Sequence, residues 1–491
     1  MFFKGNNNKK VFFIAPLDPH MESKQVIIRL GRWIQSRGSW LAPVFFLGAV
    51  FLFLYLPMYE SKFIVMDENS LQVNRGFKAP SMASMDTTPK WRERLVRGRH
   101  ANGGEVVAVY VSLQAPASIA MANTIINTIT KNNPYGCDVH FFFFDEEDPS
   151  PMPTPAVFAR ASLVFRFRDF DHLICFDSFG KNGGQPNRDL ASVVSLASYE
   201  LSLSPICDSP GVARRSKDKV NSFVYSLEQS VKACTHPKRW HSLPSNTISF
   251  HTSPFRASQS QKNTGATYAK AVMYMISKLD HLEEDFHHAA HSWMSVDQHN
   301  YVAFNAMQFI IILGTASCVA VGYGVYQKKG VSLSPWLVAL PGAGFLLTAA
   351  RHVAGDVGIV LLSVALVLLY GTMDYSCILV VSVSIIFMPL SIGFQPAMGV
   401  LGALAIPIQA IWLAEMGLVQ NVVAQLLGFV ISWVVFYYFY VVLDTPLVAT
   451  QDFANAYICI CIYPTAVWVS SRLVNRLFFS GKSRRNVHNS K

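Results

Sequence analysis

Charged side chains are scarce in this chain of 491 residues. Only 15% of the residues are Asp, Glu, Lys or Arg, whereas 51% are hydrophobic. A soluble globular protein carries about 25% charged residues, so this composition excludes a protein whose whole surface faces water. The shortage is most pronounced over residues 303–470, which hold eight charged side chains.

Several short motifs that mark common enzyme sites are also missing. The chain has no Gly-x-Ser-x-Gly segment, no phosphate-binding loop and no Cys/His pattern typical of a cysteine protease. The sequence therefore gives no support to a serine hydrolase, a P-loop nucleotide hydrolase or a protease acting on its own. An Asn-x-Ser/Thr glycosylation site is absent too, and this neither supports nor excludes a luminal domain.

The basic residues are concentrated at the two ends of the chain. Of a formal net charge of +10, residues 1–40 contribute seven Lys/Arg against two acids, and residues 471–491 contribute six Lys/Arg and no acid. A nucleic-acid-binding domain carries its Lys/Arg as a patch on the folded body, so nucleic acid is not expected as a partner. Basic flanks are instead typical of the cytosolic segments of membrane proteins.

Apolar runs of the length that a bilayer requires predict a polytopic α-helical membrane protein with about eight transmembrane helices. The first is an uncleaved signal anchor over 41–58, and the others form a bundle over 303–473. Two of the shorter runs could form a re-entrant hairpin. The Lys/Arg bias predicts that the tails 1–40 and 474–491 are both cytosolic and that residues 60–301 are luminal. The expected spans of the bundle are 303–325, 334–350, 357–373, 376–394, 397–414, 421–442 and 454–473.

The luminal region 60–301 is predicted to form an α/β domain. Apolar strands at 105–113 and 138–144 flank a helical stretch at 117–131, and this order indicates a parallel sheet. A strand at 173–177 and a helix at 187–202 repeat the pattern, whereas the polar region 208–262 gives no clear assignment. Apolar residues spaced three and four apart predict that the domain ends in an amphipathic helix over 264–299.

Cysteine residues in the luminal region raise the question of disulfides. Four cysteines lie there, an even number, in a compartment that should be oxidising. Cys207 and Cys234 form the candidate disulfide, because both lie in the loop-like part. Buried cysteines that form no disulfide are the alternative.

Two clusters of side chains could hold a metal ion. Asp145–Asp148 (DEED) follows the strand 138–144, at the edge where an open parallel sheet binds its ligands. Glu146 and Glu147 could bind zinc there or act as a general base; with no His or Asp at 112–116, a solvated acidic turn is the alternative. A second group in the helix 264–299 could bridge a metal, or else face a partner or lipid headgroups: His281, Glu284, His287, His288 and His291.

Four segments together resemble one family, the non-protease Gaa subunit of GPI transamidase. Val65–Leu71 (VMDENSL) is similar to that family's segment after its first span, and Gly180–Leu190 (GKNGGQPNRDL) to its Asn- and Pro-containing turn. Lys278–His287 (KLDHLEEDFH) resembles a family helix, and Tyr463-Pro464 matches a Tyr-Pro in the family's final helix. The order of these segments and the plan of one span, a luminal α/β domain and further spans extend the resemblance over nearly the whole chain.

The resemblance implies a luminal zinc-aminopeptidase-like fold without a complete metal set and without a cofactor. It also implies a non-catalytic subunit in the endoplasmic reticulum membrane, whose partners include a caspase-like cysteine protease subunit and GPI lipid. On this basis Pro464 and Tyr463 are candidates for binding GPI, and so are Glu68 and Asn69 at the luminal face of the membrane. The candidates that would face a partner or the headgroup are His281, Glu284, His287, Asn182 and Asn187.

Two other functions stay open on the sequence alone. The first is an active membrane metallo-aminopeptidase or amide-forming enzyme that uses Glu146 and Glu147. The second is a polytopic transporter, for which the spans offer little support, because they carry no buried charge pair and no proton-relay pattern.

Overall fold

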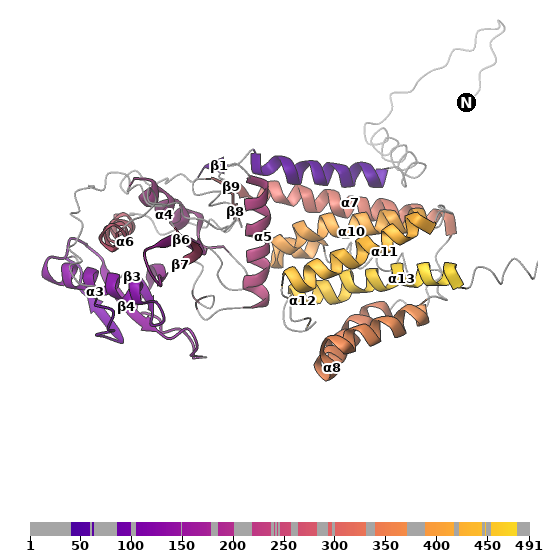
Figure 1. Cartoon of the computed structure of the whole chain (residues 1–491). Coiled ribbons are helices and arrows are strands. Elements are labelled where there is room, and N and C mark those ends of the chain that lie inside the picture. The colour runs from indigo at the N-terminus through magenta and orange to yellow at the C-terminus, as the bar shows by residue number, and fades with distance from the viewer. Residues whose placement is uncertain are drawn as a thin grey trace, which may run out of the picture.

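In the computed structural model the chain has two parts, an α/β domain and a bundle of apolar helices, which lie end to end with helix α5 between them (Figure 1). The structure describes residues 41–58, 61–62, 86–99, 105–148, 150–177, 185–200, 219–236, 240, 243, 246–256, 264–281, 293–296, 300–329, 339–370, 388–416, 422–443, 447 and 453–478.

A six-stranded sheet forms the centre of the α/β domain. Its strand order is β2-β4-β3-β5-β7-β6; β4, β3, β5 and β7 are parallel, and the edge strands β2 and β6 are antiparallel to their neighbours. The prediction of an α/β sheet is confirmed, although β6 does not continue the parallel pattern. The strands are β2 (Glu93–Val96), β3 (Val106–Ser112), β4 (Asp138–Phe144), β5 (Ala159–Arg166), β6 (His172–Asp177) and β7 (Thr247–Arg256).

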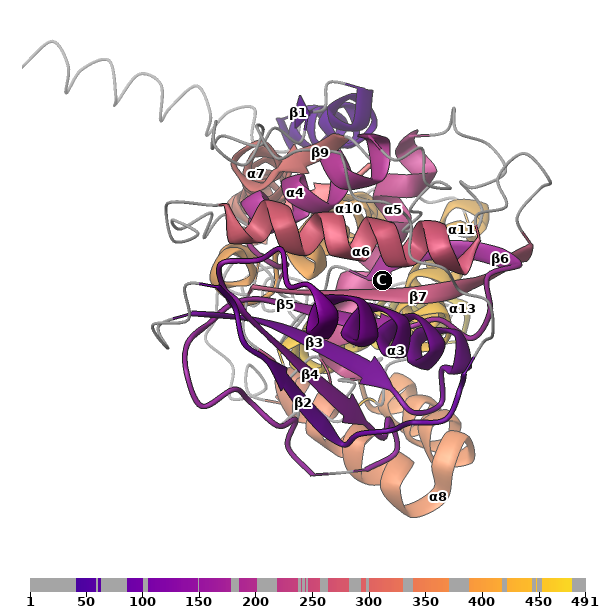
Figure 2. The ribbon, with the colours of Figure 1, turned by 90° about the vertical axis from the view of Figure 1, so that its left-hand side faces the viewer.

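Three helices cover one face of this sheet: α3 (Pro116–Lys131), α4 (Arg188–Glu200) and α6 (Gly265–Asp280). Figure 2 shows α3 and α6 in front of the strands. Their apolar side chains join those of alternate strand residues in one core cluster. The other face packs against a smaller cluster that includes Met152, Trp240 and Leu243. One face of the sheet is therefore covered by helices. Among the described residues, the other face is covered by Met152, Trp240 and Leu243, which lie between the main helices and strands.

The predicted amphipathic helix over 264–299 is present as α6 over Gly265–Asp280 and is contradicted at Trp293–Ser295, which form a strand. Residues 282–292 lie outside the described residues. Helix α6 ends at Asp280 because the Asp280 carboxylate accepts the backbone N–H groups of Gly136 and Cys137, at 2.8 and 2.6 Å, while His281 Nδ1 lies 2.7 Å from the Ser277 carbonyl. The chain then forms strands β8 (Trp293–Ser295) and β9 (Asn300–Ala303), which build a small antiparallel sheet with β1 (Ser61–Lys62). The domain thus ends in this sheet, not in a helix.

Helix α5 (Lys219–Thr235) connects the domain to the bundle. Its apolar side chains Phe223, Leu227 and Val231 are fully buried in the core cluster of the bundle, not in that of the sheet. Polar contacts add to this junction: Tyr438 Oη donates to Glu228 Oε1 at 2.5 Å. In Figure 1, α5 stands across the end of the bundle. A helix from the polar region 208–262, which the sequence left unassigned, therefore fixes one part of the molecule on the other.

The bundle contains four helices long and apolar enough to cross a membrane, counted over the described residues: Leu41–Met58, Phe304–Gly324, Phe345–Leu368 and Phe453–Ser471. Two shorter apolar helices cover Pro396–Gln409 and Leu426–Val442. The chain is thus a membrane protein, and about eight spans remains a prediction. The elements of the bundle are the anchor helix (Leu41–Met58, whose last turn is η1, Leu56–Met58), α7 (Phe304–Lys329), α8 (Ala339–Tyr370), α10 (Pro396–Met416), α11 (Val422–Tyr437), η7 (Tyr438–Val442), α12 (Phe453–Tyr457), η8 (Ile458–Ile462) and α13 (Tyr463–Phe478).

The predicted spans 334–350 and 357–373 fall on α8, which consists of two helices joined at a kink. The kink lies between the two predicted spans, where Gly355 leaves the helical conformation with φ of 58°. Glycine tolerates this backbone conformation because it has no Cβ. Large apolar side chains on both sides of the bend are exposed, such as Leu346 and Val360. In a membrane protein these side chains have the character of a lipid-facing surface.

Small residues let the central helices approach closely. A Cβ on Gly402 would lie 2.0 Å from Tyr457 Oη, and one on Gly314 would lie 2.6 Å from the Cβ of Ala403. Such contacts are typical of helix packing in membranes, where small residues bring backbones together. The segment Gly399–Ala405 is closely packed along these contacts.

Candidate functional site

The acidic cluster lies where β4 ends, beside the end of β3. Ser112 Oγ donates to Glu146 Oε1 at 2.6 Å, and Gln114 Oε1 accepts the Glu146 backbone N–H at 3.1 Å. Gln114 Nε2 donates to Asp145 Oδ1, which also accepts the Glu147 backbone N–H at 2.9 Å. The hydroxyl of Ser112, the last residue of β3, therefore binds the Glu146 carboxylate. The side-chain amide of Gln114, two residues later, binds the Asp145 carboxylate.

These partners determine which chemistry the edge of the sheet can support. Zinc in proteins is bound by Cys, His, Asp and Glu, whereas Ser112 and Gln114 supply a hydroxyl and an amide. Within the described residues, no group of three or more His, Cys, Asp and Glu side chains is placed to hold a metal ion. In the described part of the chain, the carboxylates of Asp145–Asp148 are thus arranged as in an acidic turn.

A second cluster of polar side chains, on strands β5 and β7, was not predicted from the sequence. Ser162, Val164 and Arg166 on β5 pair with Thr247, Ser249 and His251 on β7. Arg166 Nε donates to Ser249 Oγ at 3.1 Å, and its guanidinium lies 3.8 Å from the centroid of the Trp240 ring. Burial, and then the charge of Arg166, lower the pKa of His251 to about 3, so this imidazole is neutral at physiological pH. The polar–apolar alternation of 247–251 (TISFH) was the signal that could have found this strand.

Tyr463 and Pro464 begin α13 in the interior of the bundle, and both are buried. Tyr463 Oη lies 3.0 Å from Ser363 Oγ of α8, and its ring centroid lies 5.4 Å from that of Phe436 on α11. The π-helical turn η8 comes directly before, and in it the Tyr463 N–H donates to the Ile458 carbonyl. Proline has no N–H, so Pro464 leaves the helix one donor short, and π-helical turns are frequent at functional sites. The structure thus brings three helices together around the Tyr-Pro pair.

Two of the other predicted site residues support helix ends. Asn187 Oδ1 accepts the Asp189 backbone N–H at 2.7 Å at the start of α4, and His281 ends α6 as described above. Cys234 is buried in α5, and its pairing with Cys207 stays a prediction, because Cys207 lies outside the described residues. The remaining candidates also lie outside them: Glu68, Asn69, Asn182, Glu284, His287, His288 and His291.

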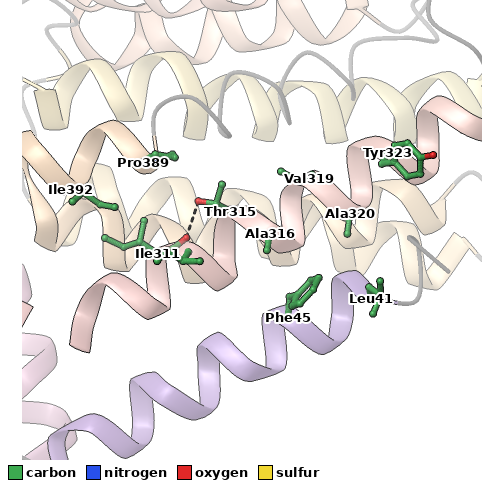
Figure 3. Close-up of a pocket in the computed structure, with 11 residues that line it drawn as sticks. Leu41, Phe45, Ile311, Thr315, Ala316, Val319, Ala320, Tyr323, Pro389 and Ile392 are labelled. Carbon is green, nitrogen blue, oxygen red and sulfur yellow. Dashed lines mark hydrogen bonds between the residues drawn. The ribbon is translucent and has the colours of Figure 1, made fainter. Parts of the chain in front are cut away.

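The bundle also contains an apolar pocket of about 760 Å³ (Figure 3). Leu41 and Phe45 of the anchor helix line it, together with seven residues of α7 from Ile311 to Tyr323 and with Pro389 and Ile392. The anchor helix is held against α7 on this side, because Ser317 Oγ donates to the Ala42 carbonyl at 2.8 Å. Sequence reasoning missed this pocket, since its walls come from three separate stretches of chain.

No protein-family model matches the chain, and no curated protein matches it. The class of the protein therefore follows from its own structure. The fold defines a membrane protein in which an α/β domain is attached to a helix bundle through α5.

Proposed function

We propose that this chain is the non-catalytic, Gaa-type subunit of a GPI transamidase in the endoplasmic reticulum membrane, with both termini in the cytosol. In this role the helix bundle binds the GPI lipid, and the α/β domain is a zinc-aminopeptidase-like fold that no longer hydrolyses peptides. The catalytic cysteine belongs to a caspase-like partner subunit. The chain's part is to present the ethanolamine amine of GPI to the thioester that the partner forms with a proprotein.

The observation that carries this proposal is the set of hydrogen bonds to the carboxylates at the edge of the sheet where β3 and β4 end. In a peptidase-like α/β fold this edge would hold the metal, and here Ser112 and Gln114 take up the carboxylates of Glu146 and Asp145. In the described part of the domain, these two carboxylates are thus bound by a hydroxyl and an amide. Because the domain is fastened through α5 to a bundle of apolar helices, its proposed contribution is placement of a membrane-bound substrate.

Placement of this kind accelerates the reaction without chemistry on this chain. GPI stays in the bilayer, and a binding site among the helices fixes where its headgroup emerges. Holding two reactants in the right geometry replaces a bimolecular encounter, which in favourable cases lowers the barrier by about 7–11 kcal/mol. The Tyr463–Pro464 region, where α8, α11 and α13 meet, is the proposed lipid contact.

Two experiments in cells and extracts test the assignment. Removing the chain is expected to cause accumulation of precursor proteins whose GPI-attachment signal is uncleaved, and re-expressing it should reverse this. Purification of the tagged chain in mild detergent is expected to bring down a caspase-like cysteine protease subunit. Normal surface display of GPI-anchored proteins in cells that lack the chain would refute the proposal.

The alternative of an active metallo-aminopeptidase makes a different prediction about metal content. We expect the purified chain to carry no stoichiometric zinc, because the partners of Glu146 are Ser112 and Gln114. The double change Glu146→Gln and Glu147→Gln should accordingly leave the metal content unchanged. Stoichiometric zinc that is lost in this variant, measured by elemental analysis, would favour the enzyme instead.

A further inference from the structure

Strand β2 is the outermost strand at one edge of the six-stranded sheet, beyond β4 (Figure 2). The Arg92 carbonyl accepts the Phe143 N–H at 2.9 Å, so in this antiparallel ladder the backbone groups of Arg92 and Arg94 face β4. Those of Glu93 and Leu95 face the open side. Among the described strands none pairs with that side, and such an edge is a template for a strand from another chain.

Two exposed arginine side chains lie along this open edge. Within the described residues, neither Arg92 nor Arg94 forms an ion pair or a side-chain hydrogen bond, whereas the next base, Arg97, lies 2.9 Å from Asp138. Strand alternation places Arg92 and Arg94 on the same face, about 7 Å apart. Leu95 is on the opposite face and is 36% exposed. The edge therefore presents two cations on one face and an apolar side chain on the other.

The charge and the position of β2 restrict what can occupy the edge. A second copy of β2 is disfavoured, because pairing the strand with itself would bring the arginines of both copies onto one face, and charged edge strands prevent such self-association. Lipid is disfavoured by position, because α3 and β4, which contact β2, lie at the end of the domain away from the membrane helices in Figure 1. The edge thus fits an acidic segment of a protein in the same aqueous compartment.

We propose that β2 is a docking edge for an extended acidic segment of a partner protein, which adds to the sheet as a further strand. The backbone of this segment binds the outward N–H and C=O groups of Glu93 and Leu95, and its acids lie opposite Arg92 and Arg94. The segment therefore has two acids separated by one residue, and an apolar residue beside the acid that faces Arg94. The acidic turn Asp145–Asp148 follows β4 close to Arg92, and it repels any further acid at that end.

Fluorescence anisotropy of labelled peptides, with the full chain in detergent, tests this proposal. The probe Thr-Leu-Glu-Thr-Glu-Thr has the expected pattern, and the reference peptide has Lys in place of both Glu. The acidic peptide should bind about tenfold more tightly, because two cross-strand pairs change from repulsive to attractive. Arg94→Glu should weaken its binding about fivefold, whereas Arg168→Glu, at an exposed base outside β2, should not. Arg92→Glu combined with Arg94→Glu should reverse the preference and favour the lysine peptide.

Hydrogen exchange separates strand addition from charge attraction alone. The bound acidic peptide should slow exchange at the Glu93 and Leu95 amides of the wild-type chain, because these face the open side. Leu95→Pro removes one of these donors at an edge position that tolerates proline, and it should abolish binding, whereas Leu95→Ala should not. The proposal is overturned if the acidic peptide binds no better than the lysine peptide, if Arg94→Glu and Arg168→Glu have equal effects, or if both amides stay unprotected. Equal binding by Leu95→Pro and Leu95→Ala would also overturn it. Since no GPI is used, these outcomes are independent of the proposed transamidase role.

Discussion

Replacing Pro464 with alanine is expected to reduce retention of GPI by the purified chain at least tenfold, while assembly with partner subunits stays intact. Alanine supplies the backbone N–H that proline lacks, so the last helix can complete its hydrogen bonds and lose the irregular turn η8. Tyr463, fixed by its contacts with Ser363 and Phe436, would have to shift with this turn. The proposed lipid contact, where α8, α11 and α13 meet, would change, and the α/β domain would not.

The matched control is Pro407, a proline inside α10. Pro407→Ala makes the same chemical change outside the Tyr463 contacts and should leave GPI retention near the wild-type value. The measurement is the amount of GPI that co-purifies with the tagged complex, normalised to the amount of partner subunits. Full retention by Pro464→Ala, or an equal loss in both variants, would contradict a lipid site at α13.

The parts of the fold that could be predicted are those whose pattern is local. Strand β4 was predicted with the bounds that it has, because Asp138–Phe144 is a continuous apolar run of the kind that a buried parallel strand requires. Helix α3 was predicted at 117–131, and Pro116 suits the first turn of the helix that the structure shows. Most side chains of both elements are buried, so the hydrophobic pattern of each segment is enough to predict it.

The parts that could not be predicted depend on contacts between distant residues. The apolar spacing of α6 continues past Asp280 in the sequence, but the helix stops because Asp280 binds the backbone at Gly136 and Cys137. The polar composition of α5 gave no sign that Phe223, Leu227 and Val231 would be buried against membrane helices. Spacing reports which side of an element is apolar, and it does not report which partner covers that side.

The candidate site was predicted to a similar extent. The carboxylates of Glu146 and Glu147, and the lack of a His or Asp after the preceding strand, were visible in the sequence. The hydrogen bonds of the Glu146 carboxylate to Ser112 and of the Asp145 carboxylate to Gln114 were not, because these depend on the parallel pairing of β3 with β4. The apolar pocket could not be predicted at all, since residues 41–45, 311–323 and 389–392 meet only in the folded bundle.

Replacing Leu227 with aspartate is expected to detach the α/β domain from the bundle. Leu227 is fully buried in the centre of α5, and an unpaired carboxylate there would cost several kcal/mol. Removing the side chain with Leu227→Ala should already cost about 2–5 kcal/mol through the cavity that it leaves. The polar contacts of α5 would not compensate, because Tyr438–Glu228 and Gln395–Ser230 are single hydrogen bonds, each with a net contribution of about 0.5–3 kcal/mol.

The control is Asn221→Asp, which adds the same charge to an exposed position of α5. Limited proteolysis in detergent should cut the Leu227→Asp variant rapidly between the domain and the bundle, and its thermal unfolding should split or shift downward. The Asn221→Asp variant should behave as the wild-type chain does. Because the proposed function requires the domain and the lipid-binding bundle to stay in fixed register, Leu227→Asp should also cause uncleaved GPI precursors to accumulate. Unchanged proteolysis and unfolding in Leu227→Asp would show that α5 is not the element that joins the two parts.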